Sequence, residues 1–311
     1  MARWGLVATI KANATDILNF AAYHLDIGAH RLFLYLDAPC PDAMPFLRAH
    51  PKIRVILCDE AHWEKRRKTR PVKHQVRQSL NATRAYRSQA GKLDWLIHMD
   101  VDEFLWSRQA ISYLLDGLAE NVFCAQVRPI EALGGDATHF KAYIPNTSDR
   151  SAIVRRLYPQ FGDHLRSGFL SHDQGKVFAR PGFEDVKFRI HNAFRNEESS
   201  PDKVEMPDVD LCHLHGKNWD DWSRQFRYRI DKGSYRSELA PNRKRELGGV
   251  TLHELLSMIE AEEGEAGLRN FYAEVCADSP TLRERLQHEG LLKNRVLKLE
   301  QKRQRQFPDF S

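Results

Sequence analysis

The sequence predicts an α/β fold in which helices cover both faces of a mostly parallel, doubly wound sheet. Apolar runs of strand length alternate with segments of helical spacing through the first half of the chain. Several of these runs end in an acidic residue, as at Asp37 and Asp100. One of them, residues 95–99, is apolar enough to be buried on both faces, as strands of parallel sheets are. Helical patterns in residues 246–311 predict a C-terminal helical extension.

The composition is that of a folded, soluble protein. The chain has 311 residues, 42% of them hydrophobic and 29% charged, which excludes a disordered protein. The net charge of +5 fits an anionic ligand or an acidic membrane surface. The sequence holds five cysteines without a Cys-x-x-Cys pair, so free thiols in a reducing compartment are expected.

The elements are predicted in chain order. Residues 4–10 form the first strand, and the helix after it is capped by Thr15 or Asp16 and ends at Gly28. Residues 136–172 show no clear period, which is typical of a functional loop or lid. The later strands are expected over residues 31–36, 53–58, 95–99, 122–127 and 188–192, and the later helices over 71–90, 110–119, 218–232 and 291–306, with further helices starting at Thr251 and Ser279.

Two aspartates follow the buried strand over residues 95–99. Asp100 and Asp102 sit at its carboxyl end, where open α/β sheets bind ligands. Two residues apart on extended chain, they project to the same side, and their mutual repulsion favours a bound cation. Carboxylate oxygens suit Mn²⁺ or Mg²⁺. The alternative is a capped strand end without metal. A second Asp-x-Asp, residues 208–210, lacks such a strand and serves as an internal control.

The motif has a resemblance to a known family. Residues 94–105, Asp-Trp-Leu-Ile-His-Met-Asp-Val-Asp-Glu-Phe-Leu, resemble the donor-site motif of glycosyltransferases with the GT-A fold, in particular the family 2-like and family 92-like group. The resemblance covers roughly residues 4–235. It implies a Rossmann-like GT-A domain over 1–245, with a nucleotide-sugar half (about 1–130) and an acceptor half (about 131–245), followed by the helical extension over 246–311.

The same resemblance implies an activity. The expected reaction is metal-dependent transfer of a sugar from a nucleotide-sugar, UDP-linked, to a hydroxyl of a glycan or other acceptor, with inversion, in bacterial polysaccharide synthesis. Eukaryotic relatives in the Golgi usually carry a membrane anchor. The sequence has no apolar stretch of ~18 residues and no signal peptide, so a bacterial, cytoplasmic protein is expected. The basic C-terminal helix is the predicted peripheral membrane contact.

Candidate donor contacts come from several segments. In the family, the first strand–helix loop reads like Lys-Asn-Glu; here it is Lys-Ala-Asn-Ala, without the Glu. The expected nucleotide contacts there are Thr9 and Asn13, and Asp37 is expected to accept from the ribose or uracil edge. The resemblance also implies that the donor is contacted by Asp100, by Lys73 in a Lys/Arg- and Gln-rich turn, and by Lys176, which would neutralise phosphate. For Asp37 the alternative is a plain loop residue, and for Lys73 it is a surface residue near the basic run.

The acceptor half supplies the remaining candidates. His213 and His215 lie two apart on a predicted strand, without further Cys or His at zinc spacing. The family has a His here as an extra metal ligand, which implies His215, with His213 as the alternate. Asp173 and Glu131 are the candidate catalytic bases. For the two histidines the alternative is packing in or near the core.

Two other function classes stay open at this point. The first is a metal-dependent hydrolase or phosphotransferase using Asp100, Asp102 and the histidines at 213 and 215. The second is a nucleic-acid-binding module that uses the basic run over residues 65–70. Since no zinc-finger, RNA-recognition or helix-turn-helix signature accompanies that run, a nucleic-acid partner is not expected.

Overall fold

A computed structural model describes residues 1–67, 69–165, 167–241 and 245–310. The chain forms two compact units. The first unit consists of residues 1–128, 174–211 and 297–311, and the second of residues 129–173 and 212–296. This division differs from the predicted boundary at residue 245, because residues 246–296 belong to the second unit, which begins at residue 129, and residues 297–311 belong to the first.

The first unit is built on a mixed sheet, which confirms the predicted α/β class. Its four parallel strands lie in the order β4-β1-β2-β3, and β8 and then β6 add antiparallel to β4 and to β8. Strands β6 and β12 carry the chain from the first unit into the second, and β12 pairs with β5 and β6. The bounds are β1 (Trp4–Ile10), β2 (Arg31–Leu36), β3 (Ile53–Leu57), β4 (Trp95–His98), β5 (Glu103–Ser107), β6 (Cys124–Ala132), β8 (Lys176–Ala179) and β12 (Lys203–His213).

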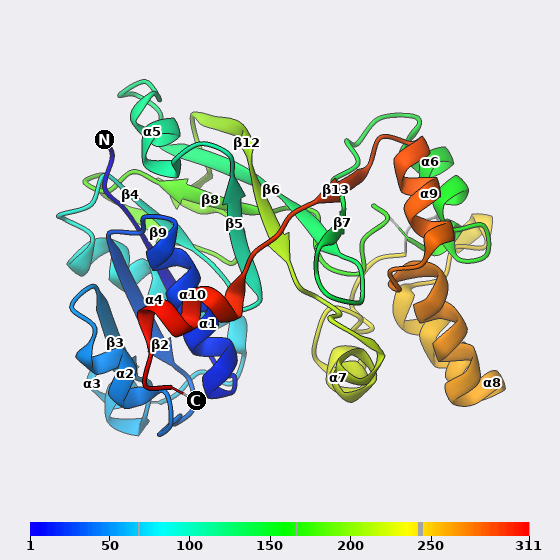
Figure 1. The fold of residues 1–311 in the computed structure, drawn as a ribbon, viewed down its shortest axis with the longest axis horizontal. Helices are drawn as coiled ribbons and strands as arrows, with labels where there is room; N and C mark the ends of the chain where they lie inside the picture. Colours follow the sequence, from blue (N-terminus) through cyan, green and yellow to red (C-terminus); the bar gives the residue numbers. More distant parts are fainter. Residues whose placement is uncertain (68, 166, 242–244, 311) are drawn as a thin grey trace. The chain divides into compact units, whose positions relative to one another are not determined.

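Both faces of this sheet are buried. On one face, Val7 and its cross-strand neighbour Phe33 pack against Ala82 of α4 (His74–Gln89). The alternate residues of the same strands, such as Leu6, are equally buried on the opposite face. Figure 1 shows α1 (Ala14–Asp26) and α10 (Leu299–Gln306) in front of the sheet. Burial on two faces explains why the strands read as nearly continuous apolar runs.

Helix α1 is capped by a residue that the sequence analysis did not assign to this role. The side chain of Asn13 accepts a hydrogen bond from the backbone N–H of Asp16 at 2.9 Å, so the helix starts earlier than a cap at Thr15 or Asp16 requires. The short helices and strands that complete the first unit are α2 (Met44–Ala49), α3 (Glu60–Arg67), α5 (Ile111–Asp116), β9 (Val186–Phe188), β10 (Ala193–Arg195) and β11 (Glu198–Ser199).

The second unit combines the end of β6 with helices. Strand β7 pairs antiparallel with both β6 and β13. The predicted capping box is confirmed, because Thr251 and Glu254 satisfy each other's backbone N–H groups at the start of α8. Residues 136–172, predicted as a loop or lid, contain a strand and a helix. The elements are β7 (His139–Lys141), α6 (Arg150–Leu157), η1 (Gly162–His164), α7 (Trp219–Asp231), η2 (Arg245–Leu247), α8 (Leu252–Val275), α9 (Pro280–His288) and β13 (Leu292–Asn294).

The C-terminal residues do not form the single helix predicted over 291–306. Strand β13 comes first, and only α10 is helical. Two basic side chains of α10, Lys302 and Arg305, donate to Asp26 of α1, the latter at 2.6 Å. These cations are used inside the first unit, so the membrane contact of this helix stays a prediction. Among the described residues, no helix is long and apolar enough to cross a membrane.

A buried histidine in α1 makes the stability of the first unit depend on pH. The Nδ1 of His24 donates to the carbonyl oxygen of Phe20 at 2.8 Å, and its ring stacks on Phe104. Burial lowers the pKa of His24 to about 3. In an unfolded chain a histidine titrates near pH ~6.5. Between these two values the unfolded state binds the extra proton, so stability falls as pH drops from ~6.5 towards 3.

We expect the substitution His24→Leu to flatten this pH dependence. One differential proton contributes a slope of up to about 1.4 kcal/mol per pH unit, and the variant should lose that contribution between pH ~6 and ~4. Urea unfolding at several pH values measures it, with the same substitution at the exposed His288 as the control. An unchanged slope in His24→Leu would show that His24 is not the group responsible.

Candidate functional site

The Asp-Val-Asp motif forms a tight turn at the end of β4. The backbone N–H of Glu103 donates to the carbonyl oxygen of Asp100 at 3.1 Å, and the N–H of Asp100 donates to the Glu103 carboxylate at 2.8 Å. The prediction that Asp100 and Asp102 lie on extended chain was wrong, because residues 100–103 form a turn between β4 and β5. The two bonds hold the backbone of the motif independently of the Asp102 side chain.

Asp100 is held on both of its carboxylate oxygens. Gln78, from α4, donates to one oxygen, and the ammonium of Lys176, from β8, donates to the other at 2.7 Å. The side chain of Lys176 is only 1% exposed, and it also lies 3.4 Å from Glu103, whose side chain is 0% exposed. Asp100 itself keeps 28% of its side chain exposed. Two separate elements, α4 and β8, thus hold one carboxylate.

Charges explain the protonation states in this cluster. Burial alone would lower the pKa of Lys176, but the carboxylates of Asp100 and Glu103 outweigh it and raise that pKa. The side chain of Lys176 therefore stays protonated and positively charged. The neighbouring His98 is fully buried in β4, and burial together with the charge of Lys176 lowers its pKa to about 4. Its imidazole is accordingly neutral at physiological pH.

Asp37, at the end of β2, is enclosed by cations. Its carboxylate accepts from Arg77 at 2.7 Å and from Arg70 at 3.0 Å, and the ring of His74 lies 3.4 Å away. Burial would raise the pKa of Asp37, but the hydrogen bonds from these three side chains hold it well below the usual range. Arg77 also donates to the backbone carbonyls of residues 71 and 72, so Asp37 anchors the segment that leads into α4.

The other predicted nucleotide contacts of the first unit have internal partners or lie on the surface. The hydroxyl of Thr9 accepts from the side chain of Asn81 at 3.1 Å, and Asn13 is used as the cap of α1. Lys73 is exposed at the N-terminal end of α4. Lys68 of the basic run lies outside the described residues, and so do the side chains of residues 66 and 67. The roles of all these residues in donor binding stay predictions.

The second unit holds the two predicted histidines close together. The ring centroids of His213 and His215 are 5.3 Å apart, and that of His172 is 5.4 Å from His213. The Nε2 of His215 is 3.1 Å from the hydroxyl of Tyr235, to which the indole N–H of Trp222 also donates. This contact fixes the orientation of the His215 ring. Sequence reasoning did not single out His172 or Tyr235.

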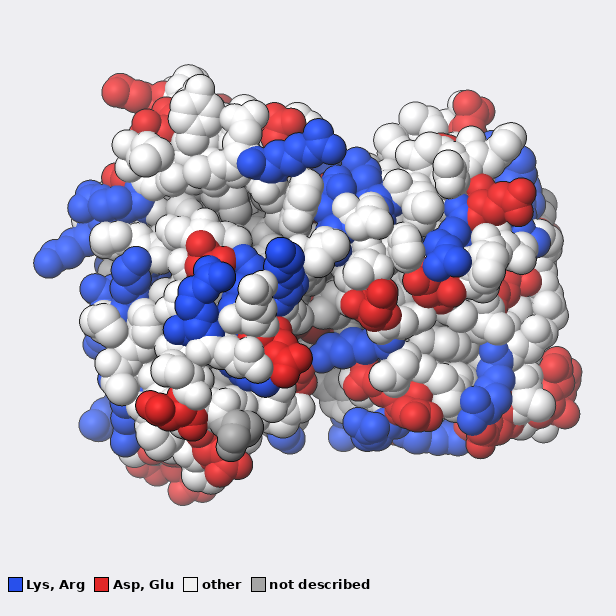
Figure 2. Space-filling model, viewed as in Figure 1, with Lys and Arg blue, Asp and Glu red and all other residues white. Residues whose placement is uncertain are grey.

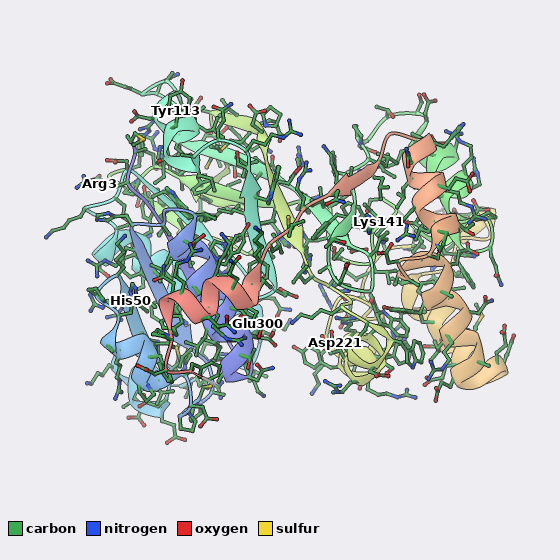
Figure 3. All side chains as sticks on the ribbon, in the orientation of Figure 1. Arg3, His50, Tyr113, Lys141, Asp221 and Glu300 are labelled. Carbon is green, nitrogen blue, oxygen red and sulfur yellow. The ribbon has the colours of Figure 1, made fainter. Side chains whose placement is uncertain are left out.

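The two candidate bases have different surroundings. Glu131 is buried, its carboxylate lies 2.6 Å from the ammonium of Lys141, and it accepts from the backbone N–H of Leu170 and Ser171. Burial would raise the pKa of Glu131, but Lys141 holds it well below its usual range, which makes Glu131 a weak proton acceptor. Figure 3 shows Lys141 on β7. Asp173 is 19% exposed and lies 3.4 Å from Arg150.

A further group of potential metal ligands lies in the second unit. Ligand atoms of Asp136, His139 and Asp278 all lie within 4.8 Å of one another. Two of them already bond to each other, since His139 contacts Asp278 at 2.9 Å. Arg283 also contacts Asp278 at 3.2 Å. These three residues can hold a cation. Because His139 and Arg283 already contact the Asp278 carboxylate, they make a weak metal centre.

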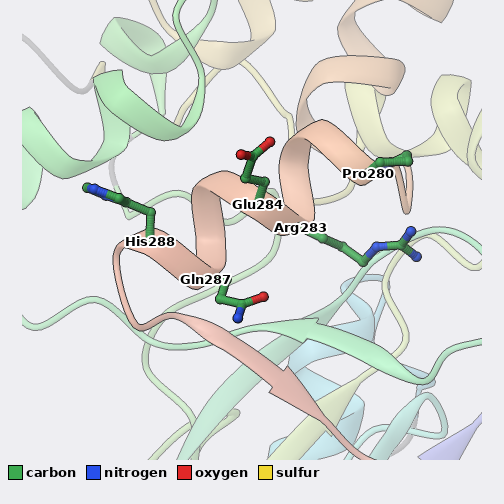
Figure 4. A pocket seen from close by; sticks show the side chains of 5 residues that line it. All are labelled: Pro280, Arg283, Glu284, Gln287 and His288. Carbon is green, nitrogen blue, oxygen red and sulfur yellow. The ribbon is translucent and has the colours of Figure 1, made fainter.

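The surface offers two more observations. Basic and acidic side chains are interspersed on the face shown in Figure 2, over both units. Figure 4 shows an open depression lined by side chains of α9 alone, including Arg283, Glu284 and His288. A depression formed by one helix lacks the converging polar groups of a binding site.

Comparison with known proteins finds similar solved structures. No protein-family model and no curated protein matches the sequence. Similar solved structures include the galactosyltransferase LgtC in complex with donor and acceptor sugar analogs, at 15% identity over 57% of this chain and 57% of that chain, with a TM-score of 0.27. GalNAc-T7 with UDP, GalNAc and Mn²⁺ matches at 10% identity over 84% of this chain and 58% of that chain, with a TM-score of 0.39.

A third similar structure is glucosyl-3-phosphoglycerate synthase from Mycobacterium tuberculosis in complex with phosphoglyceric acid. It matches at 16% identity over 58% of this chain and 57% of that chain, with a TM-score of 0.28. The chain thus spans less than two thirds of the length of each of these three proteins.

Proposed function

We propose that this protein is a metal-dependent glycosyltransferase that moves a sugar from a nucleotide-sugar, UDP-linked, to a hydroxyl of a glycan or other acceptor. The observation that carries the proposal is the carboxylate turn at the end of β4. There, Asp100 is fixed by donors from two other elements, and Asp102 follows on the same turn. Such rigid support of one carboxylate is typical of a functional site rather than of a solvated loop.

The residues present fit a divalent cation. Asp100 and Asp102 offer carboxylate oxygens, which Mn²⁺ and Mg²⁺ prefer. When bound, the cation would neutralise the charge that develops on the departing diphosphate. His215, with His213 as the alternate, is proposed as a further ligand. Its contact with Tyr235 is the kind of outer hydrogen bond that orients a metal-binding imidazole.

The chain's own residues supply the rest of the reaction. The acceptor hydroxyl attacks the anomeric carbon, the bond from that carbon to the diphosphate oxygen breaks, and a single displacement inverts the configuration. A carboxylate takes the proton of the hydroxyl. We assign this role to Asp173, because Glu131 is already committed to Lys141. Thr9, Asn13, Asp37 and Lys73 are proposed to border the nucleotide.

The proposal is tested by supplying nucleotide-sugars with candidate glycan acceptors and measuring release of the nucleoside diphosphate. We expect release that requires both Mn²⁺ or Mg²⁺ and an acceptor. Release that is metal-dependent but unaffected by any acceptor would instead indicate the hydrolase. No release from any nucleotide-sugar, together with salt-sensitive binding to nucleic acid, would indicate the basic binding module.

A further inference from the structure

Lys176 uses all of its hydrogen-bonding capacity inside the first unit. An ammonium group has three N–H donors. In the structure the ammonium lies 2.7 Å from Asp100, 3.1 Å from the carbonyl oxygen of Ile190 and 3.4 Å from Glu103. A direct bond to a donor phosphate would require one of these contacts to break. The expectation that Lys176 neutralises phosphate therefore stays a prediction.

The lysine also changes the charge of the metal-binding turn. Three carboxylates, those of Asp100, Asp102 and Glu103, share the turn with one ammonium, so the formal charge of these four side chains is about −2. Lys176 and Glu103 are buried, and electrostatic interactions are stronger away from water. A buried ammonium bonded to Asp100 therefore opposes the approach of a second cation to that carboxylate.

We propose that Lys176 is a positioning residue that orients Asp100 and lowers the affinity of the turn for a free divalent cation. The inference rests on the proposed function. Because Lys176 balances Asp100, the turn binds Mn²⁺ tightly only when a diphosphate brings further negative charge. Metal and nucleotide then bind cooperatively, and by linkage each strengthens the other to the same extent.

A charge cycle at two positions tests this inference. Lys176→Met removes the ammonium and makes the cluster more negative. Glu103→Gln makes it less negative while keeping an oxygen that accepts from the N–H of Asp100. The double variant Lys176→Met/Glu103→Gln restores the original charge. It also replaces the buried Glu103 carboxylate, which would otherwise face an apolar side chain. Mn²⁺ affinity of the free protein, measured by calorimetry, is expected to rise about 10-fold in Lys176→Met, to fall in Glu103→Gln, and to return near the wild-type value in the double variant.

Two further variants serve as controls. Lys176→Arg keeps the charge and is expected to retain the wild-type Mn²⁺ affinity. Asp102→Asn, measured in parallel, corrects for ions bound elsewhere, for example at Asp136 and Asp278. Urea unfolding of each variant confirms that it is folded, and the charge-neutral double variant keeps the test available if Lys176→Met is too unstable.

The outcomes separate this inference from the proposed function. If wild-type protein binds Mn²⁺ with UDP but Lys176→Met binds free Mn²⁺ no more tightly, the inference is overturned and the proposed function stands. The same holds if Lys176→Met weakens UDP binding without changing Mn²⁺ affinity, which would assign Lys176 to the donor. If neither protein binds Mn²⁺, with or without UDP, the proposed function itself fails.

Discussion

Asp102→Ala is expected to abolish sugar transfer and leave the protein folded. Losing a ligand of the cation that stabilises the leaving diphosphate should lower kcat by at least about 10³-fold. The fold should survive, because the turn is closed by the Asp100–Glu103 bonds, in which the Asp102 side chain has no part. Initial rates of nucleoside diphosphate release and urea unfolding together measure the two effects.

The chain contains a matched control for this substitution. Asp208 belongs to the second Asp-x-Asp sequence, lies on β12 and is exposed. Asp208→Ala removes the same chemical group from the same type of sequence, so it is expected to retain wild-type rates. Full activity in Asp102→Ala would remove the central claim, and equal losses in both variants would point to a general effect of charge.

Lys141→Met is expected to destabilise the second unit severely. The ammonium of Lys141 is buried beside Glu131 and also contacts the backbone carbonyls of Gly168 and Val275. Removing one partner of a buried ion pair leaves an uncompensated charge, which typically costs about 3–5 kcal/mol. Attraction between the two groups holds the pKa of Lys141 above and that of Glu131 below their usual values. Urea unfolding at neutral pH measures the loss.

A second substitution identifies the cause of this loss. The double variant Lys141→Met/Glu131→Gln removes the unpaired charge but keeps an oxygen for the backbone N–H groups of Leu170 and Ser171, so it is expected to recover much of the stability. Lys187→Met breaks an exposed pair with Glu197 and should have little effect. If the double variant is as unstable as Lys141→Met, lost packing rather than charge explains the result.

The sequence predicted well what depends on local patterns. The bounds of β1 and β2 follow from apolar runs, and the capping box of α8 follows from the spacing of Thr251 and Glu254. Local rules also have limits. Asn13, rather than the predicted Thr15 or Asp16, caps α1. These three polar residues lie so close together that the sequence does not distinguish between them as caps. The turn at Asp100 carries no Gly, Pro or Asn signal, so it read as extended chain.

The site itself depends on contacts between distant segments. The bond between Lys176 and Asp100 joins residues 76 positions apart, and Gln78 reaches the same carboxylate from α4. Neither pairing leaves a periodic signal in one sequence. The enclosure of Asp37 by Arg70 and Arg77 was likewise missed, although the basic run was noticed. An acid at this strand end was predicted, whereas its burial and its internal partners were not.

The most direct test of the metal and nucleotide site is thermal stability in the presence of UDP, GDP, CMP or ADP, each with and without Mn²⁺. A ligand at ~100 times its dissociation constant stabilises a protein by about 2.7 kcal/mol. If Asp100 and Asp102 hold the metal and nucleotide, we expect stabilisation by UDP that requires Mn²⁺ and disappears in Asp102→Ala. No shift with any nucleotide, or an identical shift in Asp102→Ala, would contradict it.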